Sequence, residues 1–163
     1  NDNHSAAQQA DLVVVAVPWA AHDSTLAELR ECLAGRLVVD CVNPLGFDER
    51  GPFALRVPAG SAVEQASQLL PASTVVGAFH HVSSALLLEE RVTSIDCDVM
   101  VVGDDRAAVD RVISLAELIP GLRGRYAGRL RNAGQVEALT ANLIAVNRRY
   151  RTHSGIRITG VED

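Results

Sequence analysis

The sequence has few aromatic residues and no apolar run long enough to cross a bilayer. Aromatic residues make up 4% of the 163 residues, although 48% of the chain is apolar, with alanine, valine and leucine dominant. This composition favours a packed α/β domain over a disordered chain. The short apolar runs argue against a membrane span, and the length suits one sizeable core.

The sequence also lacks an excess of positive charge and any close pair of cysteines. The formal net charge is −5 and acids and bases are interspersed, which argues against nucleic acid or an anionic membrane as a partner. Cys32, Cys41 and Cys97 are widely spaced, so we expect reduced thiols in a cytoplasmic protein. The first residues do not resemble a signal peptide.

Several catalytic and cofactor-binding motifs are absent from the sequence. It contains no Walker loop, no Gly-x-Gly-x-x-Gly turn and no Gly-x-Ser-x-Gly elbow. His4, His22 and His153 show no ligand spacing, so we expect no metal site. The dinucleotide fingerprint belongs to the first βαβ unit of a doubly wound fold. We therefore expect this chain to lack that unit.

What the sequence does contain is three short apolar runs, each followed by a polar or proline-containing loop. The runs and the residues at which they stop are Leu12–Val17 at Pro18-Trp19, Leu37–Val42 at Asn43-Pro44, and Thr74–Ala78 at His80-His81. Runs of this kind are typical of buried parallel strands. Because ligands of open α/β sheets bind outside the carboxyl ends of the strands, we predict the functional crevice there.

Helices are predicted between and after these strands. The spacing of Leu26, Leu29 and Leu33 predicts a helix over residues 23–33, with Asp23 or Ser24 as its cap. Residues 43–60 are rich in glycine and proline and are interpreted as an ordered, functional loop. The remaining predicted elements are a helix over 61–70 with a capping box at Ser61 and Glu64, a strand over 99–102, a helix over 106–119 capped by Asp104 or Asp105, one short strand within 122–130, and a helix over 132–150 with Val136, Leu139, Leu143, Ile144 and Tyr150 on one side. The pattern predicts an α/β fold with a Rossmann-like, mostly parallel sheet and a small helical C-terminal part.

The two adjacent histidines, His80 and His81, follow the third strand. Side chains of neighbouring residues in an extended segment point to opposite faces, so the two rings cannot act as a pair. We expect one of them to face the crevice and the other to pack or cap. For Val17-Pro18-Trp19, residue chemistry leaves open a plain strand end and a loop beneath a bound cofactor.

Six segments, taken in order, resemble one protein family. They are Ala16–Trp19, Val39–Gly46, Ala78–Ser83, Cys97–Asp105, Ala127–Asn132 and Glu137–Ile144. Over nearly the whole chain they resemble the NADPH-dependent coenzyme F420 reductases. The resemblance implies hydride transfer between NADP(H) and the deazaflavin coenzyme F420 in a cytoplasmic homodimer or larger homo-oligomer. It also implies a division into residues 1–105, the remainder of an NADP-binding Rossmann domain, and residues 106–163, a helical part that closes the deazaflavin cleft.

The resemblance further implies a set of site residues. Those that match cofactor loops are Val17, Pro18 and Trp19 beside the NADP ribose, Asn43 and Pro44 near the nicotinamide, and Ser84 at the carboxamide. Those on the helix closing the deazaflavin pocket are Leu139, Asn142 and Leu143. His80 and Val82 match the catalytic pair that lines the place where the two rings meet. His80 would then orient a ring or stabilise charge on the reduced deazaflavin.

One departure from the family concerns the cofactor phosphates. Family members begin with a strand, a Gly-rich turn and a helix, followed by a Ser-Arg-type pair for the 2′-phosphate, and this sequence contains none of these. We expect at least ~30 residues of that portion to be missing, and NADPH binding by the chain alone to be poor for want of the phosphate-binding turn. An NADP-dependent reductase of a small imine or β-hydroxyacid, and a non-catalytic dimerising module, remain as alternatives. The direction of hydride transfer, the oligomer size and the preference for NADP over NAD stay open.

Overall fold

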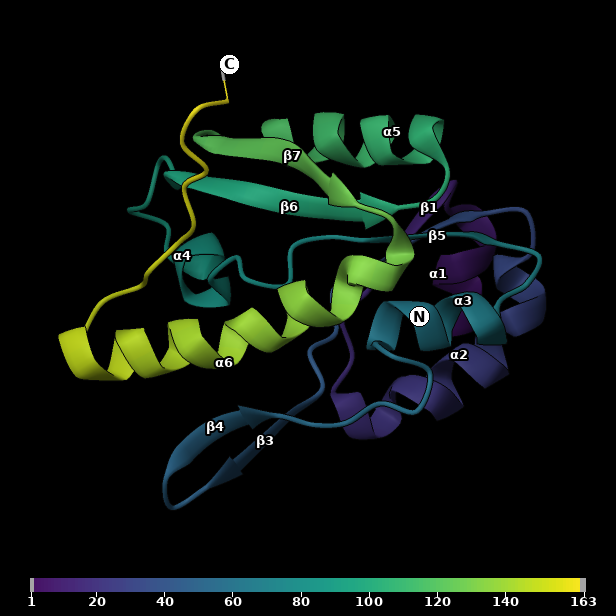
Figure 1. The fold of residues 1–163 in the computed structure, drawn as a ribbon. Helices are drawn as coiled ribbons and strands as arrows, with labels where there is room; N and C mark the ends of the chain where they lie inside the picture. Colours follow the sequence, from purple (N-terminus) through teal and green to yellow (C-terminus); the bar gives the residue numbers. More distant parts are fainter. Residues whose placement is uncertain (1, 162–163) are drawn as a thin grey trace.

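A five-stranded sheet in the order β1-β2-β5-β6-β7 forms the centre of the structure (Figure 1). The computed structural model describes residues 2–161. The strands are β1 (Leu12–Val15), β2 (Leu37–Asp40), β5 (Thr74–Gly77), β6 (Cys97–Gly103) and β7 (Leu122–Gly128). Three of the four neighbouring pairs are parallel, whereas β5 and β6 run antiparallel. The prediction of a Rossmann-like, mostly parallel sheet is confirmed.

The central strands form where β-branched residues can pack on both faces of the sheet. Val38 and Val75 join one core cluster while their neighbours Val39 and Val76 join the other, since successive side chains of a strand point to opposite faces. β2 is buried along its whole length. β1 differs from the predicted fully buried strand, because it lies at the edge of the described sheet and Val14 is 47% exposed.

Helices cover both faces of the sheet. Helices α1 (Asn3–Gln9), α2 (Trp19–Leu33), α3 (Ala62–Leu69) and the first half of α6 (Ala133–Tyr150) contribute to one core cluster, and α5 (Arg106–Glu117) contributes to the other. Figure 1 shows α5 on one side of the sheet and α2, α3 and α6 on the opposite side. A short helix, α4 (Ser84–Leu88), follows β5, and one 3-10 turn (Leu130–Asn132) precedes α6.

The start of α2 corrects the sequence prediction. The helix begins at Trp19, directly after Pro18, so the predicted cap at Asp23 or Ser24 is wrong. Proline suits this place because its fixed φ fits the start of a helix and its missing N–H is not needed there. The Ser24 hydroxyl instead donates to the Ala21 carbonyl inside the helix, at 3.2 Å.

The cap of α3 confirms its prediction. The Ser61 hydroxyl accepts a hydrogen bond from the Glu64 N–H at 3.0 Å, and it also donates to the Glu64 carboxylate at 3.0 Å. One of the helix's unpaired N-terminal N–H groups is thereby satisfied locally. At the start of α5, Asp105 acts in the same way and accepts from the Ala108 N–H at 2.9 Å.

The predicted loop over residues 43–60 contains a hairpin that the sequence analysis missed. Its strands are β3 (Leu45–Asp48) and β4 (Gly51–Ala54), which pair antiparallel. Asp48 closes the turn by accepting from the N–H groups of Arg50 and Gly51, at 2.8 and 3.1 Å. Gly51 has a φ of +119°, a conformation that favours glycine. Asp48 and Gly51 were therefore the overlooked turn signal.

The second half of α6 also departs from prediction. Val136 is buried, but Tyr150 is 72% exposed, so the predicted apolar side is buried only along the first half of the helix. Figure 1 shows why, because the C-terminal half of α6 extends beyond the sheet.

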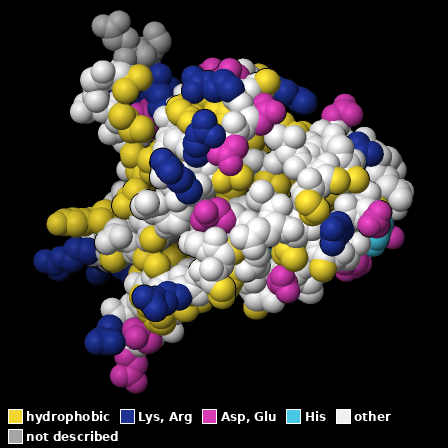
Figure 2. All heavy atoms as spheres, turned by 45° about the vertical axis from the view of Figure 1, so that its right-hand side comes forward, with side chains coloured by type: hydrophobic (Ala, Val, Ile, Leu, Met, Phe, Trp, Pro, Cys, Tyr) yellow, Lys and Arg dark blue, Asp and Glu magenta, His cyan; other side chains and the backbone are white. Residues whose placement is uncertain are grey.

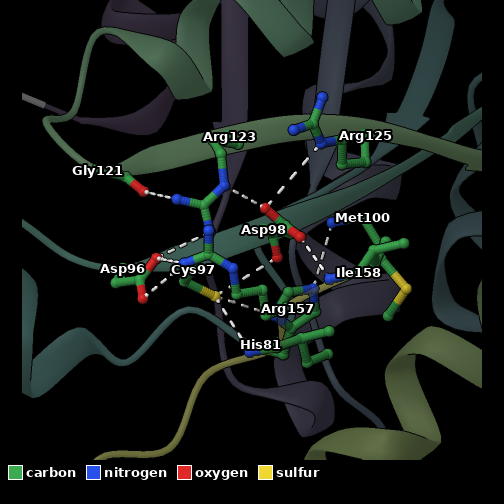
Figure 3. A network of polar contacts seen from close by, with 11 residues as sticks. His81, Asp96, Cys97, Asp98, Met100, Gly121, Arg123, Arg125, Arg157 and Ile158 are labelled. Atoms are coloured by element: carbon green, nitrogen blue, oxygen red, sulfur yellow. Dashed lines mark hydrogen bonds and ion pairs between the residues drawn. The ribbon is translucent and has the colours of Figure 1, made fainter. Parts of the chain in front are cut away.

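A polar network fastens the segment after α6 to the sheet (Figure 3). The Asp98 N–H on β6 donates to the Ile156 carbonyl at 2.7 Å, and the Asp98 carboxylate accepts from the Ile158 N–H and from Arg123. Burial of Asp98 raises its pKa, yet these donors outweigh burial and hold the pKa below its usual range. The exposed carboxylate of Asp96 pairs with Arg123 and Arg157, each at 2.9 Å.

The outer surface carries charges of both signs. On the face shown in Figure 2, acidic and basic side chains are interspersed, so this face produces no field of a single sign. Within residues 2–161, no helix has both the length and the apolar character that a membrane crossing requires.

Candidate functional site

The loops that follow β2 and β5 meet at one edge of the sheet. Asp40 and Gly77 are register partners at the ends of these parallel strands, so the two chains leave the sheet side by side. The Asn43 side-chain amide then donates to the His80 carbonyl at 2.7 Å. Two residues predicted from different loops are therefore in direct contact.

Helix α6 adds a residue that the sequence analysis missed. The Thr140 hydroxyl donates to the same His80 carbonyl at 3.0 Å and lies 3.4 Å from the Asn43 side-chain oxygen. The carbonyl thus accepts two hydrogen bonds, from a loop and from a helix far along the chain. A hydroxyl residue inside an apolar helix was the signal in the sequence, but only the tertiary contact gives it meaning.

The backbone just before His80 is unusual. Phe79 has a φ of +64°, a left-handed conformation that is rare for a bulky residue, and the Val82 N–H donates back to the Phe79 carbonyl at 3.1 Å. The predicted extended segment is therefore wrong, because His80 and His81 lie in a turn. Strained residues of this kind occur where the surrounding structure fixes them, often at functional sites.

The His80 ring is buried, with 3% of the residue exposed, and it packs against the end of β5. A Cβ placed on Gly77 would come within 3.1 Å of its Nε2. Neither ring nitrogen has a hydrogen-bond partner of ordinary geometry among residues 2–161. Burial lowers the pKa of His80 to about 4, although Asp40 acts in the opposite direction. At neutral pH the ring is thus uncharged, with one N–H and one lone pair unused.

The neighbouring ring, His81, has a structural environment. Its Nε2 accepts from the Met100 N–H at 3.2 Å, and its Nδ1 lies 3.8 Å from the Cys97 sulfur (Figure 3). Burial lowers the pKa of His81 to about 4 as well. Both nitrogens of the His81 ring therefore have a polar neighbour, whereas those of the His80 ring have no hydrogen-bond partner of ordinary geometry in the described part of the chain.

A buried polar pair supports the loop that carries Asn43. The Asp40 carboxylate accepts from the Val42 N–H at 2.9 Å and from His22 Nε2 at 2.6 Å. The Gln65 side-chain nitrogen lies 3.3 Å from the other His22 nitrogen, Nδ1. His22 and Asp40 are both fully buried. An aspartate within a buried valine run was the available signal, and the sequence analysis did not use it.

The other predicted site residues lie in several different places. Val17 lines a hollow of about 300 Å³ between β1 and α1, and the Trp19 ring lies 5.4 Å from the His22 ring. Pro44 is buried and Val82 packs against the core on the α5 side, whereas Pro18, Ser84 and Asn142 are exposed. Leu139 lines a separate hollow of about 420 Å³ with Met100 and Ala127, and Leu143 is half-buried.

Comparisons with known proteins identify the family of the chain. Residues 1–44 match the family described as "NADP oxidoreductase coenzyme F420-dependent". The F420-dependent NADP reductase of Methanocaldococcus jannaschii is 37% identical over 99% of this chain and 73% of its own length. The protein of the same name from Methanothermobacter thermautotrophicus is 36% identical over 99% of this chain and 71% of its own length.

One solved structure has a similar fold over nearly the whole chain. The crystal structure of a candidate F420-dependent NADP reductase from Arthrobacter sp. FB24 is 27% identical and has a TM-score of 0.84. The match covers 96% of this chain and 73% of that one. Given the identity to the two curated reductases over almost its entire length, this chain belongs to the family of F420-dependent NADP reductases.

Proposed function

We propose that the protein is an NADPH:coenzyme F420 oxidoreductase, which transfers a hydride between NADP(H) and the deazaflavin of coenzyme F420. The observation that carries the proposal is the turn over residues 79–82, which we call the His80 turn. The His80 carbonyl is held by Asn43 and Thr140, while the two nitrogen atoms of its buried ring have no hydrogen-bond partner of ordinary geometry within residues 2–161. The names of the relatives support the identity of the two cofactors.

The His80 ring fits a role in binding rather than in proton transfer. An imidazole with a pKa of about 4 is neutral at physiological pH, so it can donate and accept hydrogen bonds without acting as a strong acid. The cofactors supply the hydride chemistry when they are bound, and what the chain contributes is position and exclusion of water. His80 would orient a ring, and Val82 would line the apolar place where the rings meet.

The remaining proposed roles follow the loops around His80. Val17, Pro18 and Trp19 would hold the ribose of NADP, and Asn43, Pro44 and Ser84 would hold the nicotinamide end. Leu139, Asn142 and Leu143 on α6 would contact the deazaflavin. In this proposal residues 1–105 serve NADP and residues 106–163 close the deazaflavin side. Thr140 on α6 joins the two parts, because its hydroxyl donates to the His80 carbonyl.

We further propose that the protein acts in the cytoplasm as a homo-oligomer. Three free thiols suit a reducing compartment. Phe47 and Phe53 on the β3–β4 hairpin are 59% and 44% exposed, which provides apolar surface for a second copy. A sedimentation mass equal to one chain would contradict the second part of this proposal.

The direct test is anaerobic absorbance of oxidised coenzyme F420 mixed with NADPH and the full-length protein. We expect bleaching that requires NADPH and is lost in His80→Ala. His4→Ala is the matched control, because it removes a half-exposed histidine on α1 and should leave bleaching unchanged. Bleaching that survives His80→Ala would make His80 structural only. A folded, NADPH-binding protein that bleaches nothing would refute the proposed reaction and favour a small-substrate reductase.

A further inference from the structure

A buried carboxylate on α6 lies outside the contact described above. Glu137 is 3% exposed, and its two oxygens accept hydrogen bonds from the N–H groups of Ala62 and Val63, at 2.9 and 3.1 Å. These are the first two residues of α3, whose N–H groups have no partner within their own helix. Glu137 therefore caps α3 from a position 74 to 75 residues away in the sequence.

The same face of α6 continues to the His80 turn. Glu137 and Thr140 are three residues apart, so their side chains lie on one face of the helix. One turn earlier, a Cβ on Gly134 would meet the Gly60 carbonyl at 3.0 Å, so the two backbones approach closely there. Gly134 and Glu137 thus fix α6 against residues 60–63, and Thr140 carries that position to the His80 carbonyl.

Stability alone does not account for a carboxylate in this place. Burial raises the pKa of Glu137 to about 7, and the two N–H donors do not offset it. The fold therefore favours the protonated side chain, and keeping it ionised near neutral pH costs free energy. Asp40 on β2 adds to this cost, while His22 on α2 reduces it. Glu64 on α3 pairs with the Ser61 hydroxyl instead.

We propose that Glu137 is a positioning residue for hydride transfer, because its bonds to the start of α3 set the place at which Thr140 holds the His80 turn. This inference rests on the proposed function. Glu137 touches neither cofactor in this account, and it acts through Thr140 and the His80 backbone.

The test compares Glu137→Gln with Glu137→Met in the full-length protein. Glutamine keeps one acceptor oxygen and methionine keeps none, at similar volume. We expect kcat to fall roughly tenfold in Glu137→Gln and further in Glu137→Met, because hydride transfer is sensitive to small misplacements. The KM for NADPH should not change, and any fall in Tm should be too small to explain the fall in kcat. Glu117→Gln on α5 is the control, since it removes an exposed carboxylate far from α3.

A second readout does not depend on activity. In two-dimensional NMR spectra, Glu137→Gln should shift the backbone amide signals of residues 80–82, and Glu117→Gln should not. Unchanged signals there, or unchanged turnover per folded molecule, would overturn the inference. If the wild-type protein fails to bleach coenzyme F420, the proposed function fails; shifts at residues 80–82 would then still support the coupling, and their absence would refute it.

Discussion

Replacing Gly77 with alanine tests whether packing at the end of β5 controls the His80 ring. A Cβ at this position would lie 2.7 Å from a methyl group of Val63, 2.8 Å from one of Val102, and 3.1 Å from the His80 Nε2. Val63 and Val102 are fully buried, so their methyl groups have little room to retreat. Overpacking of this kind costs about 1–3 kcal/mol. In a domain of this size, it corresponds to a fall in Tm of roughly 2–12 °C.

The same substitution should also displace the His80 ring, since the ring is the third neighbour of the new methyl group. We expect the rate of coenzyme F420 bleaching to fall at least about tenfold, because a misplacement of the order of 1 Å can cost more than that. The assay pairs thermal unfolding with anaerobic absorbance, which is measured at a temperature well below the Tm of the wild type and of the variant.

Gly103→Ala is the matched control. Its Cβ would meet Val109 at 2.6 Å and Val76 at 3.3 Å, so the steric cost is similar, but neither neighbour is His80. We expect a comparable loss of Tm with turnover largely retained. Equal loss of activity in the two variants would refute the reasoning, since it would mean that general destabilisation, and not the ring position, limits the rate.

Three further predictions concern ionisable groups. Asp98→Asn should lower the free energy of unfolding, measured in urea, by roughly 1.5–3 kcal/mol, because a buried charged acceptor is lost. Asp96→Asn, at an exposed side chain, should lower it by less than about 1 kcal/mol. Equal effects of the two substitutions would contradict the role of Asp98 in the polar network. Since the pKa of Asp98 is lowered by folding, its contribution is present above its unfolded pKa and should disappear as the pH falls through the folded value. Glu137 has the opposite sign: its pKa is raised from 4.5 to about 7, so wild-type stability should decline by up to about 3 kcal/mol as the pH rises across that interval, and a Glu137→Gln variant with the same slope would refute the assignment. His80, with a pKa of about 4, should impose no inflection on the bleaching rate between about pH 6 and 8, and a His80 ring that titrates in that range in NMR spectra would contradict this prediction.

The sequence predicted those features that depend on local chemistry. The valine runs of β2 and β5, the Ser61 cap and the loops after the strands follow from side-chain period, capping and strand-end logic, and all are present. The resemblance to known reductases implied a place near the nicotinamide for Asn43 and a place where the two rings meet for His80, and it did not predict the hydrogen bond between these two residues. These signals are readable because each lies within a few residues of the feature it predicts.

What the sequence did not predict depends on contacts made across the fold. The His22–Asp40 pair joins α2 to β2, and Glu137 joins α6 to α3, so neither has a local signature. The left-handed Phe79 also has no sequence signal, because a bulky residue adopts that conformation only where its surroundings require it. The start of α2 was misplaced because Asp23 and Ser24 are good caps in general, yet Pro18 precedes them.

Gly134, Glu137 and Thr140 lie on one face of α6. The number of residues between them should therefore be more tightly constrained than the identity of those residues. Each residue turns an α-helix by about 100°, so one residue inserted between Glu137 and Thr140 would swing the hydroxyl to another side while leaving the α3 cap intact. The helix therefore fixes the spacing between its contact with the start of α3 and its contact with the His80 carbonyl. An insertion between Asp48 and Gly51 would cost the two local hydrogen bonds that Asp48 accepts in the exposed β3–β4 turn, but it would leave the spacing of Glu137 and Thr140 unchanged, so we expect it to be accepted more readily.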